Sequence, residues 1–444
     1  MTMKTHPIPV HHTDRLRLAL LCFVATLIST TTDRAATPGG ISDGTSNTIL
    51  IGEGVGGRFD NRSTGVLGEV VIDENKSIEL PLDGILHFKS LKVLPDKTLS
   101  FTRNAHNTPV YILSQGDVSI EGVINISGSR APENTPTGGL GGPGGFDGGK
   151  PGFGEVPPGA GYGPGGGKGG NTDSHSKGGA GSGSYSTVSP AWSNPNKGAI
   201  YGSKLLIPMI GGSGGGGAAG TPGKGGGGGG GAVLVSSNTR ILISGKIFSN
   251  GGAANGAGGN VGSGGAVRLV APQVAGTGEI NVNTQNDWAG HGRIRVDTLD
   301  RSQLRLNFQP LDSLSVGANM FVFPPLVPKL DVIEVAGNVI QPGSGPVTLQ
   351  LPFGSDPNLT VKIKATGWNR IVPIQVVLTP DSGAPTVFKA QIDNRLLADG
   401  SVRIVGFPNS STVSVPVVFP VNTLVTIHCW NVPSTGEILP FIEP

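Results

Sequence analysis

The chain has 444 residues, of which only 14% are charged, and its net charge is +2. This composition argues against a nucleic-acid partner, which requires a stripe of Lys and Arg, and aromatic residues at 5% leave few stacking platforms for bases. With 75 glycines and 35 prolines the chain approaches the composition of disordered proteins, but short alternating apolar segments predict β-strands instead.

Residues 1–36 have the pattern of an export signal. Lys4, Arg15 and Arg17 precede the apolar run 18–28, which suits the core of a signal peptide and is too short to span a bilayer. The end, Arg34-Ala-Ala36, lacks a small residue at the first position of an A-x-A cleavage site, so an uncleaved anchor and an ordinary leader stay open as alternatives. We expect a secreted protein, extracellular or in the cell envelope, with no membrane span beyond this leader.

Removal of the leader would leave Cys429 as the only thiol, because Cys22 lies inside the apolar run. No internal disulfide could then form, although export leads to an oxidising compartment. Stability would come from backbone ladders and apolar packing, with Cys429 buried in a strand beside Trp430. Residues 37–67 follow the leader as a short N-terminal segment.

From Gly68 onward, short apolar segments alternate with turn signals such as Asp83-Gly84 and Pro95-Asp96. Short strands at close spacing predict a sandwich, a barrel or a solenoid. The segments are 70–72, 85–88, 91–93, 99–101 and 110–112.

An internal repeat selects the solenoid. Residues 118–128 align with 241–251 and more loosely with 274–284, and each copy has a β-rich triplet followed by glycine at its fifth position. Such a glycine fits a tight corner between two strands. We therefore predict a parallel β-solenoid over residues 68–323, with a glycine-rich insertion at 129–231 that leaves it at one corner.

Glycine dominates that insertion, since 39 of the 75 glycines lie between residues 138 and 231. Glycine has no side chain to bury and the largest ordering entropy, so this belt must be ordered by its flanks or stay loose. Its Gly-Lys pairs lack the spacing of a phosphate-binding P-loop, and glycine does not recur at every third position as in collagen. Asp147, Glu155 and Asp173 stand alone in the belt and are predicted to be solvated.

The third region, 324–444, begins at a proline-rich linker, 324–328. Eight short apolar segments then follow within about 100 residues, which predicts an immunoglobulin-like β-sandwich without the usual disulfide. They are 332–335, 347–351, 359–364, 374–378, 387–392, 402–405, 413–419 and 424–430.

One cluster brings together residue types used in polysaccharide chemistry. Asp287, Trp288, His291 and Arg293 supply an acid, an aromatic ring, a base and a cation within seven residues. They are candidate carbohydrate contacts, although at the end of a solenoid such residues also cap exposed apolar turns. His175 has no second ligand at a regular spacing, so no metal site and no cofactor are predicted.

Residues 107–128, Gly264-Gly-Ala-Val-Arg-Leu269 and Gly292-Arg-Ile-Arg295 resemble segments of uncharacterised bacterial secreted glycine-rich β-solenoid proteins. The resemblance covers about 68–297 and implies an extracellular or envelope protein without established catalytic residues. Residues 42–53 are similar to a short motif of planctomycete exported pilin-like proteins. In this chain they also suit a turn at Asp43-Gly44 before a strand.

The sequence therefore predicts a secreted or cell-envelope structural or adhesive protein that is not an enzyme, with extracellular polysaccharide or envelope components as its expected partners. Two other hypotheses stay open. One is a polysaccharide lyase or glycoside hydrolase built on a parallel β-helix, and the other is a non-catalytic carbohydrate-binding protein.

Overall fold

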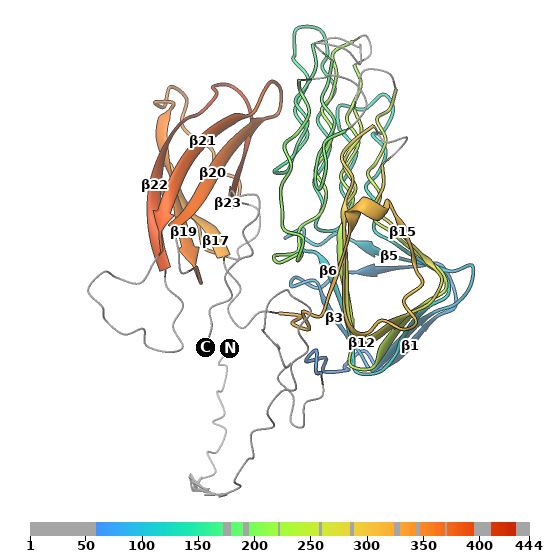
Figure 1. Ribbon diagram of the computed structural model, residues 1–444. Helices are drawn as coiled ribbons and strands as arrows, with labels where there is room; N and C mark the ends of the chain where they lie inside the picture. Colours follow the sequence, from blue (N-terminus) through green and yellow to red (C-terminus); the bar gives the residue numbers. More distant parts are fainter. Residues whose placement is uncertain are drawn as a thin grey trace, which may run out of the picture. The chain divides into compact units, whose positions relative to one another are not determined.

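The computed structural model is essentially all-β, which confirms the predicted class (Figure 1). In the part of the chain that it describes, no helix is long and apolar enough to cross a membrane. The described residues are 59–171, 179–189, 195–220, 223–256, 260–284, 288–323, 329–342, 347–368, 371–394 and 410–431.

Every pairing among strands β1 to β16 is parallel, and the strands form three stacks that nearly close around one apolar core. Stack one holds β1 (Glu69–Ile72), β4 (Ser90–Val93), β7 (Val118–Ile120), β10 (Arg240–Ile243) and the second half of β12 (Ala266–Ala275). Stack two holds β3 (Ile85–Phe88), β6 (Val110–Ser114), β9 (Ala232–Ser237), the first half of β12, β14 (Arg293–Asp300) and β16 (Leu314–Gly317). Stack three holds β2 (Lys76–Glu79), β5 (Thr98–Thr102), β8 (Val123–Asn125), β11 (Lys246–Phe248), β13 (Glu279–Asn281) and β15 (Asn307–Gln309).

The chain visits stacks one, three and two in turn, and β12 runs through the corner between two and one. For this reason stacks one and two form a continuous 10-stranded sheet. The three stacks, here called the wall, therefore resemble a nearly closed parallel barrel more than a solenoid with separate faces. The three copies of the sequence repeat lie side by side, because Val118 pairs with Ile241 and Ile241 with Val274. A β-carbon on the fifth-position Gly245 would lie 1.9 Å from the Gly122 carbonyl oxygen, and one on Gly122 would lie 2.3 Å from the Leu94 carbonyl oxygen, which accounts for glycine at both corners.

Three insertions leave this wall, all at the corner between stacks three and two. They are 126–231 after β8, 249–265 after β11 and 282–292 after β13. Apart from isolated bridges, their described residues form extended segments without helix or strand, which run side by side in Figure 1. The glycine belt thus has two shorter insertions beside it, and the sequence also predicts the first of these, between Gly251 and Gly265.

The C-terminal region consists of two antiparallel sheets that share one apolar core. One sheet has the order β18-β17-β19-β22 and the other β21-β20-β23. The bounds are β17 (Lys329–Val335), β18 (Asn338–Val339), β19 (Asn358–Thr366), β20 (Ile371–Pro380), β21 (Thr386–Asp393), β22 (Ser410–Val418) and β23 (Val425–Asn431). Six of the eight predicted segments lie in these strands. Residues 347–351 form no strand; Pro346 and Pro352, which flank them in the sequence, each lack a backbone N–H donor. The eighth segment, 402–405, lies outside the described residues.

Candidate functional site

The described residues of the glycine belt form a bundle held together by backbone hydrogen bonds. Gly139 N–H donates to the Gly226 carbonyl (2.8 Å) and, three residues on, Gly142 N–H donates to Gly229 (2.9 Å). The same step of three links Gly227 to Asn260 and Gly230 to Ser263. A period of three residues is that of the polyproline II helix, which has no internal hydrogen bonds and can give all of its backbone groups to neighbouring segments.

The run from Gly225 to Gly231 lies at the centre of this bundle, where all three faces of the segment touch other backbones. On one face, a β-carbon on Gly226 would lie about 2 Å from the Gly215 carbonyl oxygen, and one on Gly229 equally close to that of Gly212. On a second face, a β-carbon on Gly228 would lie about 2 Å from the Leu140 carbonyl oxygen. On the third face, Gly227 is blocked by Gly252 and Gly230 by Ser249. Seven consecutive glycines are required because no face of this segment has room for a side chain.

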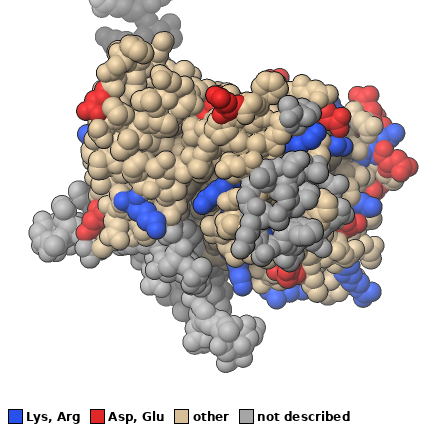
Figure 2. Space-filling model, turned by 90° about the horizontal axis from the view of Figure 1, so that it is seen from above, with Lys and Arg blue, Asp and Glu red and all other residues tan. Residues whose placement is uncertain are grey.

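On the face that Figure 2 draws, charged side chains of both signs are mixed. Broad uncharged areas lie between them. Among the described residues, no group of three or more His, Cys, Asp or Glu side chains is placed to hold a metal ion.

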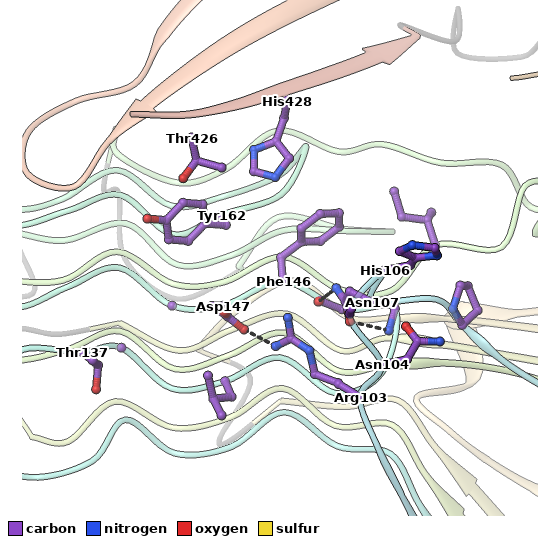
Figure 3. A pocket seen from close by; sticks show the side chains of 18 of the residues that line it. Arg103, Asn104, His106, Asn107, Thr137, Phe146, Asp147, Tyr162, Thr426 and His428 are labelled. Carbon is purple, nitrogen blue, oxygen red and sulfur yellow. Dashed lines mark hydrogen bonds and ion pairs between the residues drawn. The ribbon is translucent and has the colours of Figure 1, made fainter. Parts of the chain in front are cut away.

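A cleft of about 850 Å³ lies beside the foot of the bundle (Figure 3). Arg103, from the loop between β5 and β6, pairs with Asp147 of the belt, so Asp147 is a partly exposed charge but does not stand alone as predicted. Asn107, from the same loop, accepts a hydrogen bond from Gly144 N–H (3.0 Å) and donates to the Gly145 carbonyl (2.7 Å). These polar side chains hold the belt against the wall and are already engaged with each other.

Strand β23 supplies His428 to another wall of the cleft, stacked on Trp430 with ring centroids 4.9 Å apart and edge-on to Phe146 at 6.1 Å. Burial lowers the pKa of His428 from its ordinary 6.5 to about 4. The folded protein therefore keeps this imidazole neutral at pH values where an unfolded chain would already have protonated it.

We expect the stability of the C-terminal sheets to fall as the pH drops from about 6.5 to about 4, because the unfolded state binds a proton there that the folded state excludes. Denaturant midpoints at pH 7.5 and pH 4.5 measure the change. His428→Gln, which cannot titrate, should show a smaller pH dependence than the wild type. An equal dependence in both proteins would contradict this assignment.

Of the four predicted site residues, Asp287 lies outside the described residues and Trp288 is partly exposed, at 39%. His291 and Arg293 both contact residues of the belt. His291 N–H donates to Thr187 Oγ1 (2.9 Å), and its Nδ1 lies 3.6 Å from Asp312 Oδ1.

Arg293 donates to the Tyr201 carbonyl (2.8 Å), and its guanidinium lies 5.3 Å from the centre of the Tyr185 ring. The two tyrosines are buried and stacked with centroids 4.5 Å apart, and their hydroxyls donate to the carbonyls of Ile210 and Gly211. Burial raises the pKa of both hydroxyls, which keeps them as neutral donors. Arg293 therefore anchors the belt to the start of β14.

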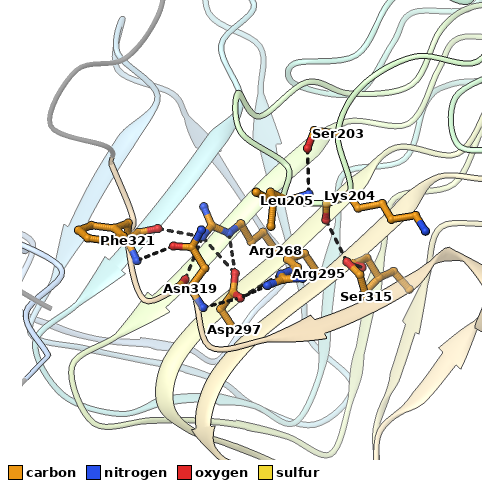
Figure 4. Close-up of polar contacts among 10 residues, drawn as sticks. Ser203, Lys204, Leu205, Arg268, Arg295, Asp297, Ser315, Asn319 and Phe321 are labelled. Carbon is orange, nitrogen blue, oxygen red and sulfur yellow. Dashed lines mark hydrogen bonds and ion pairs between the residues drawn. The ribbon is translucent and has the colours of Figure 1, made fainter. Parts of the chain in front are cut away.

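Sequence reasoning missed a buried ion cluster on the outer surface of stack two (Figure 4). Asp297 and Arg268 are almost completely buried, and Arg268 donates to Asp297 Oδ2 at 3.1 Å. Arg295 donates to the other oxygen, Oδ1, at 2.6 Å. Burial lowers the pKa of Arg268, and the Asp297 carboxylate opposes that shift. One carboxylate thus compensates two guanidinium groups away from water.

The cluster holds residues 318–323, here called the strap, across the outside of stack two. Asn319 N–H donates to Asp297 Oδ1 (2.9 Å), and Arg268 donates to the Asn319 and Phe321 carbonyls (3.2 and 2.8 Å). Met320 and Val322 of the strap then pack on outward apolar residues of the sheet, including Leu113, Leu234 and Val270. The available sequence signal was the pairing of Arg268 with Arg295 in the two matched motifs, which places two like charges side by side on neighbouring strands.

No family model, curated protein or solved structure matches this chain. Its function is therefore argued from the belt, the ion cluster and the surfaces of the stacks.

Proposed function

We propose that this protein is a secreted or cell-envelope structural or adhesive protein. Its finer architecture would be a parallel β-solenoid that carries a bundle of glycine-rich polyproline II segments, followed by an immunoglobulin-like sandwich. The parallel register of the three sequence repeats supports the solenoid, and the shared core of the two antiparallel sheets supports the sandwich.

The main observation that supports the proposal is the way the interior of the bundle is packed. Its interior is backbone packed on backbone, with extended segments spaced so closely that a methyl group is excluded at most of the glycines that face inward. Buried hydroxyls within it bind each other and the backbone, as in Ser213 Oγ to Tyr201 Oη (3.0 Å) and Ser213 N–H to Ser263 Oγ (2.8 Å). Such an interior offers rigidity and hydrogen bonding. A large ordered insertion of this kind is suited to a scaffold that holds its shape outside the cell.

The contacts around the predicted site residues support the same function over a catalytic one. His291 and Arg293 bind Thr187 and Tyr201 of the belt, and in the cleft Arg103 pairs with Asp147 while Asn107 binds the belt backbone. A lyase or hydrolase would need a carboxylate and a base that converge on open space.

Export can be tested by expressing the full chain in a bacterial host with a C-terminal tag and fractionating the cells. We expect the full chain in the medium or the envelope fraction, and a chain without residues 1–36 in the cytoplasm, because the apolar run 18–28 is the proposed signal. The periplasmic and cytoplasmic marker proteins of the host serve as controls. Retention of the full chain in the cytoplasm would overturn the proposal.

A further inference from the structure

The outer surface of stack three carries a regular column of polar side chains. The strand register places one outward residue per turn above the next, in the order Ser77, Ser100, Asn125, Phe248, Asn281 and Gln309. All six are exposed or partly exposed, while the residues between them, such as Ile124, Ile247 and Ile280, point into the core. Neighbouring strands lie about 4.8 Å apart, so the column is a ladder of hydroxyl and amide groups along the axis of the coil.

The outer surfaces of stacks one and two differ from that of stack three. Stack two is covered by the strap. On stack one the outward charged groups pair with each other across the turns, as in Arg240 with Asp117 (2.7 Å) and Lys92 with Glu121 (2.8 Å). On stack three some polar side chains also bond to each other, as in Ser77 with Thr102 (3.2 Å), but all six residues of the column remain exposed or partly exposed.

Two features of the column suit a sugar chain. Phe248 is the one aromatic ring in it, partly exposed and set in register between Asn125 and Asn281, with Lys246 Nζ over the ring at 5.8 Å from its centre. The exposed part of such a ring can stack on the C–H face of a pyranose. The amides are already oriented, since Asn281 Nδ2 donates to Glu279 Oε1 (2.8 Å) and Gln309 Nε2 donates to Asn307 Oδ1 (2.9 Å). Each NH₂ group keeps a second N–H, and fixed side chains lose less entropy on binding.

The charge of this surface also selects among polysaccharides. In the adjacent outward column, Lys246 lies 3.8 Å from Glu279, so the two charges nearest to Phe248 offset each other. A polyanion such as a uronate chain would gain nothing from such a surface, whereas a neutral chain offers vicinal hydroxyls that both donate and accept.

We propose that the outer surface of stack three binds a neutral polysaccharide, whose chain lies along the Ser77–Gln309 column with a sugar ring stacked on Phe248. This inference rests on the proposed extracellular function and names the partner and the site. The polysaccharide is held by hydroxyl and amide hydrogen bonds and is not cleaved.

Affinity electrophoresis of the full purified chain tests the proposal with hydroxyethyl cellulose, glucomannan and arabinoxylan as neutral probes and alginate as the charged probe. We expect at least one neutral probe to retard the protein. Phe248→Ala should weaken that binding about tenfold, as expected for loss of a central aromatic anchor, and Asn125→Ala should weaken it to a smaller degree. Leu242→Ala is the matched control, because it shortens an outward apolar side chain on stack one in the same turn.

Circular dichroism of each variant shows whether it is folded, and Asn125→Ala keeps the proposal testable if Phe248→Ala does not fold. Absence of retardation by all three neutral probes, retardation by alginate alone, or binding that neither variant weakens more than Leu242→Ala does would each overturn the site. These results are independent of the fractionation experiment, which tests export and not binding.

Discussion

Replacing Gly227 with alanine is expected to destabilise the glycine bundle by about 3 kcal/mol, the upper range for forcing extra atoms into a packed interior. The new β-carbon would lie 1.9 Å from the Gly252 carbonyl oxygen and 2.5 Å from its carbon. Both atoms belong to the backbone of Gly252, whose carbonyl also accepts a hydrogen bond from Gly262 N–H. They cannot move aside as the end of a flexible side chain could. The two segments must separate, which also strains the bond from Gly227 N–H to the Asn260 carbonyl.

Hydrogen exchange followed by mass spectrometry measures this effect locally, in peptides that cover residues 225–231 and 249–253. A loss of about 3 kcal/mol in opening free energy corresponds to roughly hundredfold less protection. The control is Leu140→Ala, in the adjacent segment, whose side chain is 60% exposed and should change stability by less than about 0.5 kcal/mol. Equal protection in the two variants would show that the belt is not packed as described.

The position of the belt could be predicted from the sequence, but its packing could not. Copies of the repeat on both sides of 129–231 place its two ends at one corner, and the pairing of Val118 with Ile241 agrees with that placement. Collagen was excluded because glycine does not recur at every third position over any long stretch. The bundle departs from that spacing for a physical reason: its central segment has neighbours on three faces, two of them from other parts of the belt and one from the separate insertion 249–265.

The ion cluster was hidden for a related reason. Arg268, Arg295 and Asp297 alternate with apolar residues that point into the core, so their period of two predicts solvent-facing side chains on strands. They are buried because the strap returns across the outside of stack two, which is a tertiary event that local periodicity does not report. Likewise, Arg293 was noted as a candidate carbohydrate contact, but its partners Tyr185 and Tyr201 lie about 100 residues earlier in the belt.

Removing the Asp297 carboxylate is expected to have the largest effect of any single substitution on stack two. Asp297→Ala leaves Arg268 and Arg295 buried side by side without a counter-charge, and breaking a buried ion pair in this way costs about 3–5 kcal/mol. Loss of the bond to Asn319 N–H releases the strap at the same time. We therefore expect a lower denaturation midpoint together with increased binding of a hydrophobic dye, since Met320, Val322 and Leu234 would become exposed.

The matched control is Asp117→Ala, which also removes a carboxylate that pairs with an arginine on a neighbouring strand. Asp117 and its partner Arg240 are about half exposed, at 44% and 51%, and an ion pair in water contributes about 0–1 kcal/mol. Both variants lose one negative charge, so a general effect of net charge cannot separate them. If Asp297→Ala unfolds at the same denaturant concentration as Asp117→Ala and binds no more dye, the cluster does not hold the strap. If the strap is released while the midpoint stays unchanged, the two arginines are solvated in the variant and the energetic cost of their burial was overestimated.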